Sequence, residues 1–503
     1  MTTDARSQTD FVGNDRVLFG IIFGVLAFWL FAQTTLNISP VMAEDLGVET
    51  TVMNIAVSIT ALFSGIFIVV MGSLADRFGR VRVVQWGFVL SIAGSLLVGF
   101  APSGGLGGTF LMLGRILQGL SGAFIMSASL ALVKAYWQGA ARQRAISLWS
   151  IGSWGGSGFA ALFGGLMAQN VGWRWIFFAA AALSLIGMLM VRGTPESKAE
   201  TTGHYRFDLA GVLTFMVMMV ALQVFATQGG EFGWTSIPTI ALLVTGIVFA
   251  FIFYRIETRS PHAFVDFGLF RNMTYTGATI SNFLLNATAG ILIVAMMLVQ
   301  LAGDMTAQEA GFLTIGYAIT IVAFIRVGEK LLQRFGPRKP MIWGSMIVGI
   351  AILCLMPTNL LLDTYQVLAV VGFSLFGLGL AFYATPSTDA ALSALPDAQA
   401  GSGAGIYKMA SSLGASFGVA ISATVFTVIS DGPSVQWIEG VISFIGRQDN
   451  LAVREGAFVA LAINLLMVIA AIVSIMLTIP KKKPGEGDLT TQAEVATADP
   501  KAE

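Results

Sequence analysis

Four charged side chains lie within or at the ends of long apolar stretches, where their chemistry is limited to charge pairing and proton transfer. Arg115 lies inside one stretch, Glu329 follows Arg326 by one helical turn near the end of another, and Asp389 ends a third. A carboxylate beside an arginine stays ionised unless the arginine moves away, so movement of the helices can control when it takes up a proton. We therefore predict proton coupling through these four residues.

A structural interpretation of the same residues stays open. Arg115 can serve as a hydrogen-bond hub, since Gln118 shares its face and an unpaired arginine at the centre of a span costs about 2.5–3.5 kcal/mol. The pair of Arg326 with Glu329, and Asp389, can instead be interfacial groups whose charged ends reach water. We expect Lys408 to reach the interface in the same way.

Two stripes of polar side chains indicate surfaces that face water or a ligand rather than lipid. Trp29, Gln33 and Asn37 are spaced by four residues, and Asn282 and Asn286 repeat this spacing in the second half of the chain. Amides at membrane depth need partners or water. We predict that a substrate cavity is lined by Trp29, Gln33, Asn37, Asn282, Asn286 and, further along the second stripe past Ile293, Gln300. Interhelical hydrogen bonding without a ligand is the alternative.

The segment GSLADRFGRVR (72–82) concentrates four charges in a chain that is only 11% charged. Gly72 and Asp76 share one helical face, so that a small residue permits close helix contact one turn before the carboxylate. The positive end of another helix is a suitable partner, and we predict the glycine-rich segment AGSGAGIYK (400–408). The alternative is an ordinary positively charged loop. The residues of this predicted conformational gate are Gly72, Asp76, Arg77, Gly79 and Arg80.

Long apolar segments must position these residues. With 55% hydrophobic residues and a mean hydropathy of +0.79, the chain of 503 residues is suited to a bilayer. Because one helix needs about 20 apolar residues to span it, we predict an all-α membrane protein with fourteen spans. These spans are near 17–37, 51–71, 83–101, 110–133, 147–168, 175–192, 209–228, 237–254, 274–300, 310–329, 340–360, 366–388, 403–429 and 454–479.

Charge and an internal repeat predict how the spans are organised. Most of the 28 Lys and Arg residues fall in alternate loops, which places both termini in the cytoplasm. The segment LADRFGRVR (74–82) recurs in altered form as LLQRFGPRK (331–339), as expected for two parallel six-helix halves with two added helices. The predicted regions are an N-terminal tail (1–16), a six-helix bundle (17–192), a linker with two inserted helices (193–273, helices within 209–254), a second bundle (274–479) and a disordered cytoplasmic tail (480–503).

Several kinds of chemistry have no counterpart in the sequence. There is no Gly-x4-Gly-Lys-Ser/Thr loop for ATP, and GSGAGIYK only superficially resembles one. There is no HExxH segment or Cys/His cluster, and Cys354 is the single cysteine. We therefore expect no metal, no cofactor and no enzymatic activity.

The motifs resemble those of the major facilitator superfamily. GSLADRFGRVR resembles its signature loop, GRILQGLSGA (114–123) its fourth-span motif, and GSGFAALFGG (156–165) its antiporter motif, with Ala160-Ala161 where Gly-Pro is usual. The fourteen-span drug:proton antiporters match best, and GWRWIFF, IRVGEKLLQRFG and GIYKMASSLG resemble quinolone and disinfectant exporters of the NorB/NorC type. Many relatives carry an acidic residue in the first span, where this chain has Gln33.

The resemblance implies a secondary active multidrug exporter of the cell membrane. Such a protein moves amphipathic compounds, often cationic or zwitterionic, outward while protons enter. Its expected partners are the lipid bilayer, small drug-like substrates and protons, with no nucleic acid, and we expect a monomer. Two alternatives are a dedicated metabolite or siderophore exporter of the same superfamily and a non-transporting sensor or lipid-modifying membrane protein.

Overall fold

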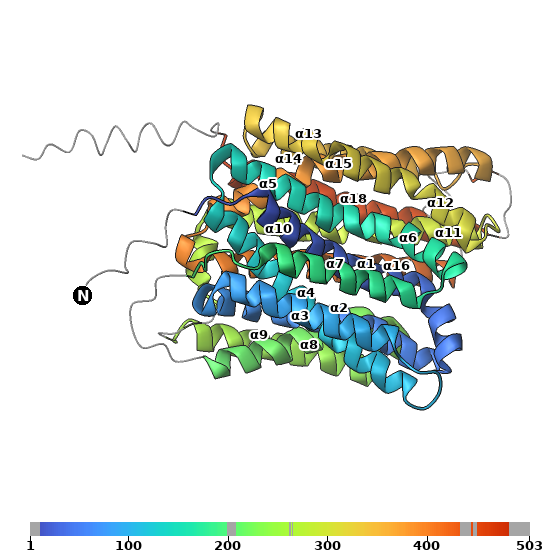
Figure 1. Cartoon of the computed structure of the whole chain (residues 1–503). Coiled ribbons are helices and arrows are strands. Elements are labelled where there is room, and N and C mark those ends of the chain that lie inside the picture. Colours follow the sequence, from blue (N-terminus) through green and yellow to red (C-terminus); the bar gives the residue numbers. More distant parts are fainter. Residues whose placement is uncertain are drawn as a thin grey trace, which may run out of the picture.

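The structure, a computed structural model, describes residues 11–198, 208–260, 263, 265–432, 444–445 and 450–481. Within these residues every regular element is a helix, which confirms the all-α prediction. The long helices run roughly side by side along the whole molecule (Figure 1). Among the described residues, thirteen segments are long and apolar enough to cross a membrane.

The first helices of the chain form one group, called here the N-bundle. In this group α4 packs against α2 and α3, and α1 packs against α6 and α7. The group corresponds to the predicted bundle 17–192, whose exact boundaries stay a prediction. Its elements are α1 (Asp15–Leu46), α2 (Thr50–Phe78), α3 (Arg80–Gly99), α4 (Gly107–Tyr136), α5 (Gly139–Ser150), the π-turn η1 (Ile151–Gly155), α6 (Gly156–Asn170) and α7 (Arg174–Val191).

The fifth predicted span, 147–168, is the one absent from the thirteen segments, because the π-turn η1 divides it. The pieces α5, η1 and α6 follow one another without a loop, but none reaches 18 residues. Gly155 lies against Val322 of α13, and Gly156 lies against Trp29 of α1. Glycines permit this close packing on two sides, and the π-turn accommodates one extra residue in the helix. Together the three pieces therefore take the place of one span.

Two further helices follow the N-bundle. They pack against each other, and α8 also contacts α2 and α16. The outer face of α9 exposes large apolar side chains, including Ile237, Ile247 and Phe251, as expected for a surface that faces lipid. The elements of this region are α8 (Leu209–Phe232), α9 (Ile237–Glu257) and the short η2 (Phe267–Arg271).

The remaining helices form a second group, called here the C-bundle. In this group α15 packs against α13 and α14, and α16 packs against α10 and α18. Its elements are α10 (Met273–Ala287), α11 (Gly290–Leu301), α12 (Ala307–Leu313), α13 (Ile315–Phe335), α14 (Arg338–Leu355), α15 (Leu362–Ser393), η3 (Asp397–Gln399), α16 (Ala400–Ser430) and α18 (Leu451–Thr478).

The ninth predicted span, 274–300, is interrupted between α10 and α11. The N–H groups of Ala289 and Ile291 donate to carbonyl oxygens only three residues earlier, each at 3.0 Å. These tighter turns change the helical phase. That one stripe runs from Asn286 through Ile293 to Gln300 stays a prediction, and all three side chains are half-buried.

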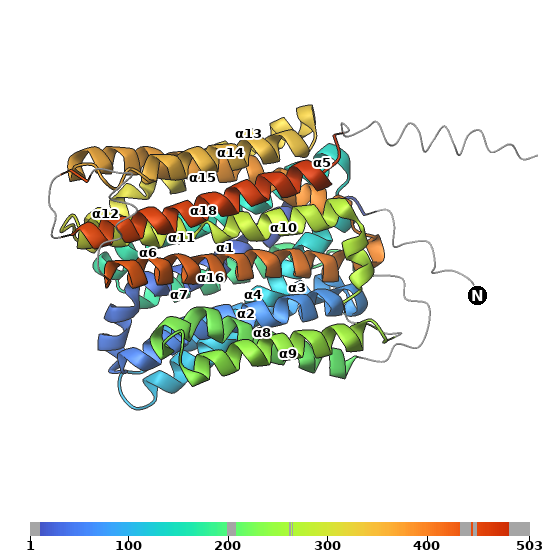
Figure 2. The ribbon, with the colours of Figure 1, turned by 180° about the vertical axis from the view of Figure 1, so that it is seen from behind.

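The start of α1 and the end of α18 lie at the same end of the molecule, called here the N/C end (Figures 1 and 2). At this end Arg144 of α5 pairs with Asp15 of α1 at 2.7 Å. Arg338, at the start of α14, donates to the carbonyl oxygen of Met476 in α18 at 2.7 Å. The loop between α2 and α3 and the start of α16 also lie at the N/C end, and this places the gate motif beside the second bundle.

Candidate functional site

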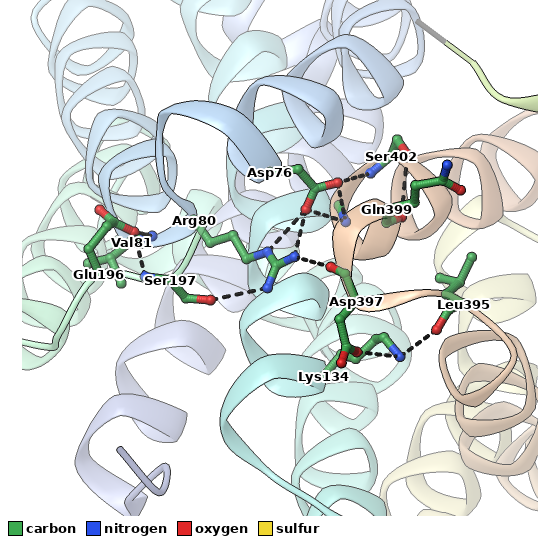
Figure 3. A network of polar contacts seen from close by, with 11 residues as sticks. Asp76, Arg80, Val81, Lys134, Glu196, Ser197, Leu395, Asp397, Gln399 and Ser402 are labelled. Atoms are coloured by element: carbon green, nitrogen blue, oxygen red, sulfur yellow. Dashed lines mark hydrogen bonds and ion pairs between the residues drawn. The ribbon is translucent and has the colours of Figure 1, made fainter. Parts of the chain in front are cut away.

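The carboxylate of Asp76 caps the start of α16, as the sequence predicts. It accepts hydrogen bonds from the backbone N–H groups of Gly401 at 2.8 Å and Ser402 at 3.0 Å (Figure 3). The first N–H groups of a helix have no partner within the helix, and the positive end of its dipole favours an anion. Only 4% of Asp76 is exposed. A buried carboxylate of the N-bundle is thus satisfied by the backbone of the C-bundle.

Close approach of α2 to α16 makes this contact possible. A Cβ at Gly72 would overlap the carbonyl oxygen of Gly401, and a Cβ at Gly405 would lie 2.8 Å from the carbonyl oxygen of Ile68. No larger side chain fits at either position without moving a backbone. Small residues on both helices therefore set the distance at which Asp76 reaches α16.

Arg80 extends the network from Asp76 to two other segments (Figure 3). Its guanidinium donates to Asp76 at 2.9 Å, to the carbonyl oxygen of Asp397 at 2.7 Å and to the hydroxyl of Ser197 at 3.1 Å. Arg80 is buried, so these charge-assisted bonds form away from water. One side chain at the start of α3 thereby joins α2, the short η3 that precedes α16, and the segment after α7.

The carboxylate of Glu196 caps the start of α3, a contact that the sequence analysis missed. It accepts hydrogen bonds from the N–H groups of Val81 at 2.8 Å and Arg82 at 3.1 Å. Gly79 adopts a φ of 115°, and a Cβ there would overlap this carboxylate. Arg77 lies in the last turn of α2 and is partly exposed. The turn of the gate motif therefore requires glycine both for its backbone conformation and for space.

Two further ion pairs connect the bundles at the N/C end. Arg142 of α5 lies 3.2 Å from the buried carboxylate of Asp389 in α15 and donates to Ser393 at 2.6 Å. Lys134 of α4 lies 3.1 Å from Asp397, whose side chain is 94% exposed. The sequence pattern indicates Asp389 but not its partner, because Arg142 comes from the other bundle.

Arg115 is fully buried and makes its contacts inside the N-bundle. It donates to the carbonyl oxygens of Ala56 at 3.0 Å and Phe31 at 3.0 Å and to the side chain of Gln118 at 2.9 Å. The ion pairs formed by the described residues do not include it. This geometry matches the hydrogen-bond hub, in which Arg115 joins α4 to α1 and α2, and its role in proton coupling stays a prediction.

Arg326 and Glu329 form an ion pair on α13, the pairing on which the sequence prediction depends. Glu329 is 4% exposed and also accepts a hydrogen bond from Gln333 at 3.2 Å. The side chain of Arg326 is 40% exposed, whereas that of Glu329 is 5% exposed, so only the arginine end of the pair reaches the surface. The involvement of this pair in proton transfer stays a prediction.

Of the predicted cavity residues in α1, Trp29 is the one whose side chain is described. Its indole N–H is buried and has no hydrogen-bond partner among the described residues. The ring packs edge-on against Phe28, with 5.3 Å between centroids. Gln33 and Asn37 belong to α1, but their side chains lie outside the described part of the structure.

The amides of α10 and α11 mainly bond to protein. Asn282 is buried and donates to the carbonyl oxygen of Tyr407 at 2.9 Å and to the hydroxyl of Ser411 at 2.6 Å. Asn286 donates to the side chain of Asn282 at 3.0 Å, and Gln300 donates to the carbonyl oxygen of Met296 at 3.1 Å. Asn282 thus joins α10 to α16, as the structural alternative holds. The roles of all three amides in substrate binding stay predictions.

Lys408 does not reach the interface, and the expectation that it does is wrong. The residue is only 8% exposed, and its ammonium lies 5.1 Å from the centre of the Trp149 ring in α5. The Trp149 ring of α5 lies over its ammonium, a contact that the local sequence of α16 does not reveal. Within the described part of the chain, no group of three His, Cys, Asp or Glu residues is arranged to hold a metal ion.

Comparisons with known proteins agree with this architecture. The sequence model of the Major Facilitator Superfamily matches residues 18–299 and 278–494. The chain is 43% identical over 95% of its length to the quinolone resistance protein NorB of Staphylococcus aureus strain MRSA252 and to that of strain COL, covering 98% of each. Similar solved structures are the proton:xylose symporter XylE (TM-score 0.63, 93% of this chain and 96% of that chain) and the human organic anion transporter MFSD10 (0.58, 92% and 98%). Both structures are 14% identical to this chain, so they show the fold alone.

Proposed function

Because the chain belongs to the major facilitator superfamily, we propose that it is a secondary active exporter of amphipathic, drug-like compounds, driven by protons that move inward. The observation that carries this proposal is the 43% identity, over 95% of the chain, to proteins named for quinolone resistance. At this coverage the likeness extends over both bundles and the two added helices. Quinolone-like compounds and cationic dyes or disinfectants are the proposed substrates.

The contacts at the N/C end support an alternating-access mechanism for this exporter. Four side chains of the N-bundle bind groups of the C-bundle at this end: Asp76, Arg80, Lys134 and Arg142. Contacts of this kind hold one end closed, and they must break for a substrate to enter there. The structure is therefore best interpreted as a state closed at the N/C end.

We propose that the N/C end faces the cytoplasm. The excess of Lys and Arg in the loops at this end follows the positive-inside rule. The protein is then a multi-pass protein of the cell membrane with both termini inside. In the closed state, substrate is released outward and protons enter from the outer side.

The pair of Arg142 and Asp389 offers a simple route for proton coupling. Protonation of Asp389 removes the charge that holds Arg142, so one proton weakens a buried contact between the bundles. Opening of the N/C end then delivers this proton to the cytoplasm and exposes the substrate path there. Glu329, buried beside Arg326 on α13, is the second candidate carrier.

Everted membrane vesicles provide the test of this function. A fluorescent amphipathic cation should accumulate in vesicles that contain the protein when their lumen is acidic. In an everted vesicle the outer side of the protein faces the lumen, so export moves the cation into the lumen while protons leave it. Vesicles from the same cells without the protein are the control. Nigericin with valinomycin in potassium buffer collapses both the pH gradient and the membrane potential, and accumulation that continues after complete collapse of both would exclude proton coupling.

A further inference from the structure

A buried lysine of α16, Lys408, faces the boundary between the two bundles, and no described residue offers its charge an anionic partner. No described residue forms an ion pair or a hydrogen bond with the ammonium of Lys408, and its contact is the face of Trp149, 5.1 Å away. A cation over an aromatic face is stabilised only in part, and a buried charge ordinarily has an anionic or hydrogen-bonded partner. The three N–H donors of the Lys408 ammonium are therefore not used by the described residues.

The neighbouring residues fix the direction in which Lys408 points. The hydroxyl of Tyr407 bonds to Ser387 of α15 at 2.9 Å, and its carbonyl oxygen accepts from Asn282 of α10 at 2.9 Å. Tyr407 is thus anchored inside the C-bundle. Successive residues of a helix point about 100° apart, and Lys408 turns instead toward Trp149 of the N-bundle.

Other buried polar groups lie at nearby positions along the helices. The hydroxyls of Ser147 and Ser150 in α5 and of Thr385 in α15 have no hydrogen-bond partner among the described residues. Ser147 and Ser150 follow Arg142 on α5, and Thr385 precedes Asp389 on α15, in each case by about one to two helical turns. Lys408 likewise follows Ser402 on α16 by six residues. Buried polar groups normally have partners, so these hydroxyls add polar side chains to the two helices at a similar depth.

We propose that Lys408 and Trp149 form an anion-binding subsite that receives the carboxylate of amphipathic acids and zwitterions. An ammonium has three donors and no acceptor, so its complement is an oxygen anion. The location between two apolar bundles selects a carboxylate that carries its own apolar body, because a small hydrated anion would lose its water without compensation. The inference rests on the proposed function and specifies part of its substrate class.

The test compares a carboxylic acid with its ester. Norfloxacin and norfloxacin methyl ester share one body and differ at the carboxylate. Binding to the purified full-length protein in nanodiscs of zwitterionic lipid is measured at pH 7 by equilibrium dialysis. Wild-type protein should bind the acid at least about tenfold more tightly than the ester, as a charge-assisted bond predicts.

Two variants assign this preference to one residue. Lys408→Met should remove the preference for the acid and change ester binding by less than about twofold. Lys330→Met, which removes an exposed lysine of α13, is the matched control and should keep the preference. Ester binding also reports that the Lys408→Met protein is folded.

The possible failures are distinguishable. Equal affinity of wild-type protein for acid and ester, or an unchanged preference in Lys408→Met, would overturn the subsite, and the first of these needs no variant to fold. Equal loss of acid and ester binding in Lys408→Met would overturn it as well, because the lysine would then act on the structure rather than on the anion. Absence of norfloxacin and dye transport by wild-type proteoliposomes would instead overturn the proposed function.

Discussion

Two buried charges lie along α16 and differ in their hydrogen-bond partners: Asp76, which reaches the start of α16 from α2, and Lys408 of α16 itself. At the N/C end, Asp76 is bound by two backbone N–H groups of α16 and by Arg80. Six residues after Ser402, Lys408 has an aromatic face and no anion among the described residues. A fully paired charge holds two helices together, whereas an unpaired one keeps capacity for a ligand. The difference suggests that closure and substrate binding are separate layers of the same interface.

The largest effect should come from separating α2 and α16 sterically. Gly72→Ala places a methyl group against the carbonyl oxygen of Gly401 and should slow dye export at least about tenfold, because overpacking costs about 1–3 kcal/mol. Gly165→Ala is the control, since its Cβ meets open space. Spin labels at Ala141→Cys and Ala398→Cys, in a Cys354→Ser background, should report wider separation at the N/C end in Gly72→Ala. Unchanged separation would show that the close approach does not set the closed state.

Removal of the charge at Asp76 should have the next largest effect. Asp76→Asn keeps the shape but weakens charge-assisted bonds worth about 1.5–3 kcal/mol each, so export slows and the same spin-label distances increase. Asp397→Asn is the matched control, because that side chain is 94% exposed and surface pairs contribute about 0–1 kcal/mol. Equal effects of the two substitutions would contradict the importance of burial at the α16 start.

Arg142 and Asp389 should behave as one unit. Arg142→Met and Asp389→Asn should each slow export, and the double variant should be no slower than the worse single variant, with a coupling of about 1 kcal/mol or more. Export rates of the four proteins, measured under one pH gradient, complete the cycle. Additive losses would show that the two residues act independently.

The smallest effect, of opposite sign, should appear at Lys408. Lys408→Met removes a charge that has no anionic partner among the described residues, so the thermal midpoint of the ligand-free protein should stay unchanged or rise. Asp76→Asn should lower the midpoint in the same assay. A marked fall for Lys408→Met would mean that the lysine is satisfied in the folded protein, and the contrast between the two charges would fail.

Much of the architecture could be predicted because it depends on local sequence. Apolar segments of sufficient length predict the helices, and a glycine-rich helix start together with Gly72 and Asp76 predicts the contact between α2 and α16. Some predicted spans are shorter than the helices that contain them: the first predicted span ends at residue 37, whereas α1 continues to Leu46. Helices extend past the apolar segment because polar residues at their ends also form helical hydrogen bonds.

The unpredicted features depend on residues from different helices. The partner of Asp389 is Arg142 from the other bundle, and no spacing rule relates the two positions. Lys408 is buried and lies against the Trp149 ring of α5. From the sequence alone, a lysine eight residues after the start of a helix is expected to reach the membrane interface. The break between α10 and α11 falls where Gly290 lies against Ser422 of α16, a tertiary contact that the sequence of α10 and α11 alone does not reveal.

The cap that Glu196 places on α3 has a consequence for the two added helices. Glu196 attaches the segment after α7 to the N-bundle by accepting hydrogen bonds from Val81 and Arg82. Helix α8 is attached to the N-bundle as well, because Gln228 of α8 donates to the hydroxyl of Ser58 in α2 at 3.5 Å. Helix α8 contacts both α2 of the N-bundle and α16 of the C-bundle. In the proposed alternating-access mechanism, one of these two contacts must change when the bundles separate. The hydrogen bond between Gln228 and Ser58 joins α8 to α2, so in the proposed alternating-access motion we expect the added pair to stay with the N-bundle and its contact with α16 to change.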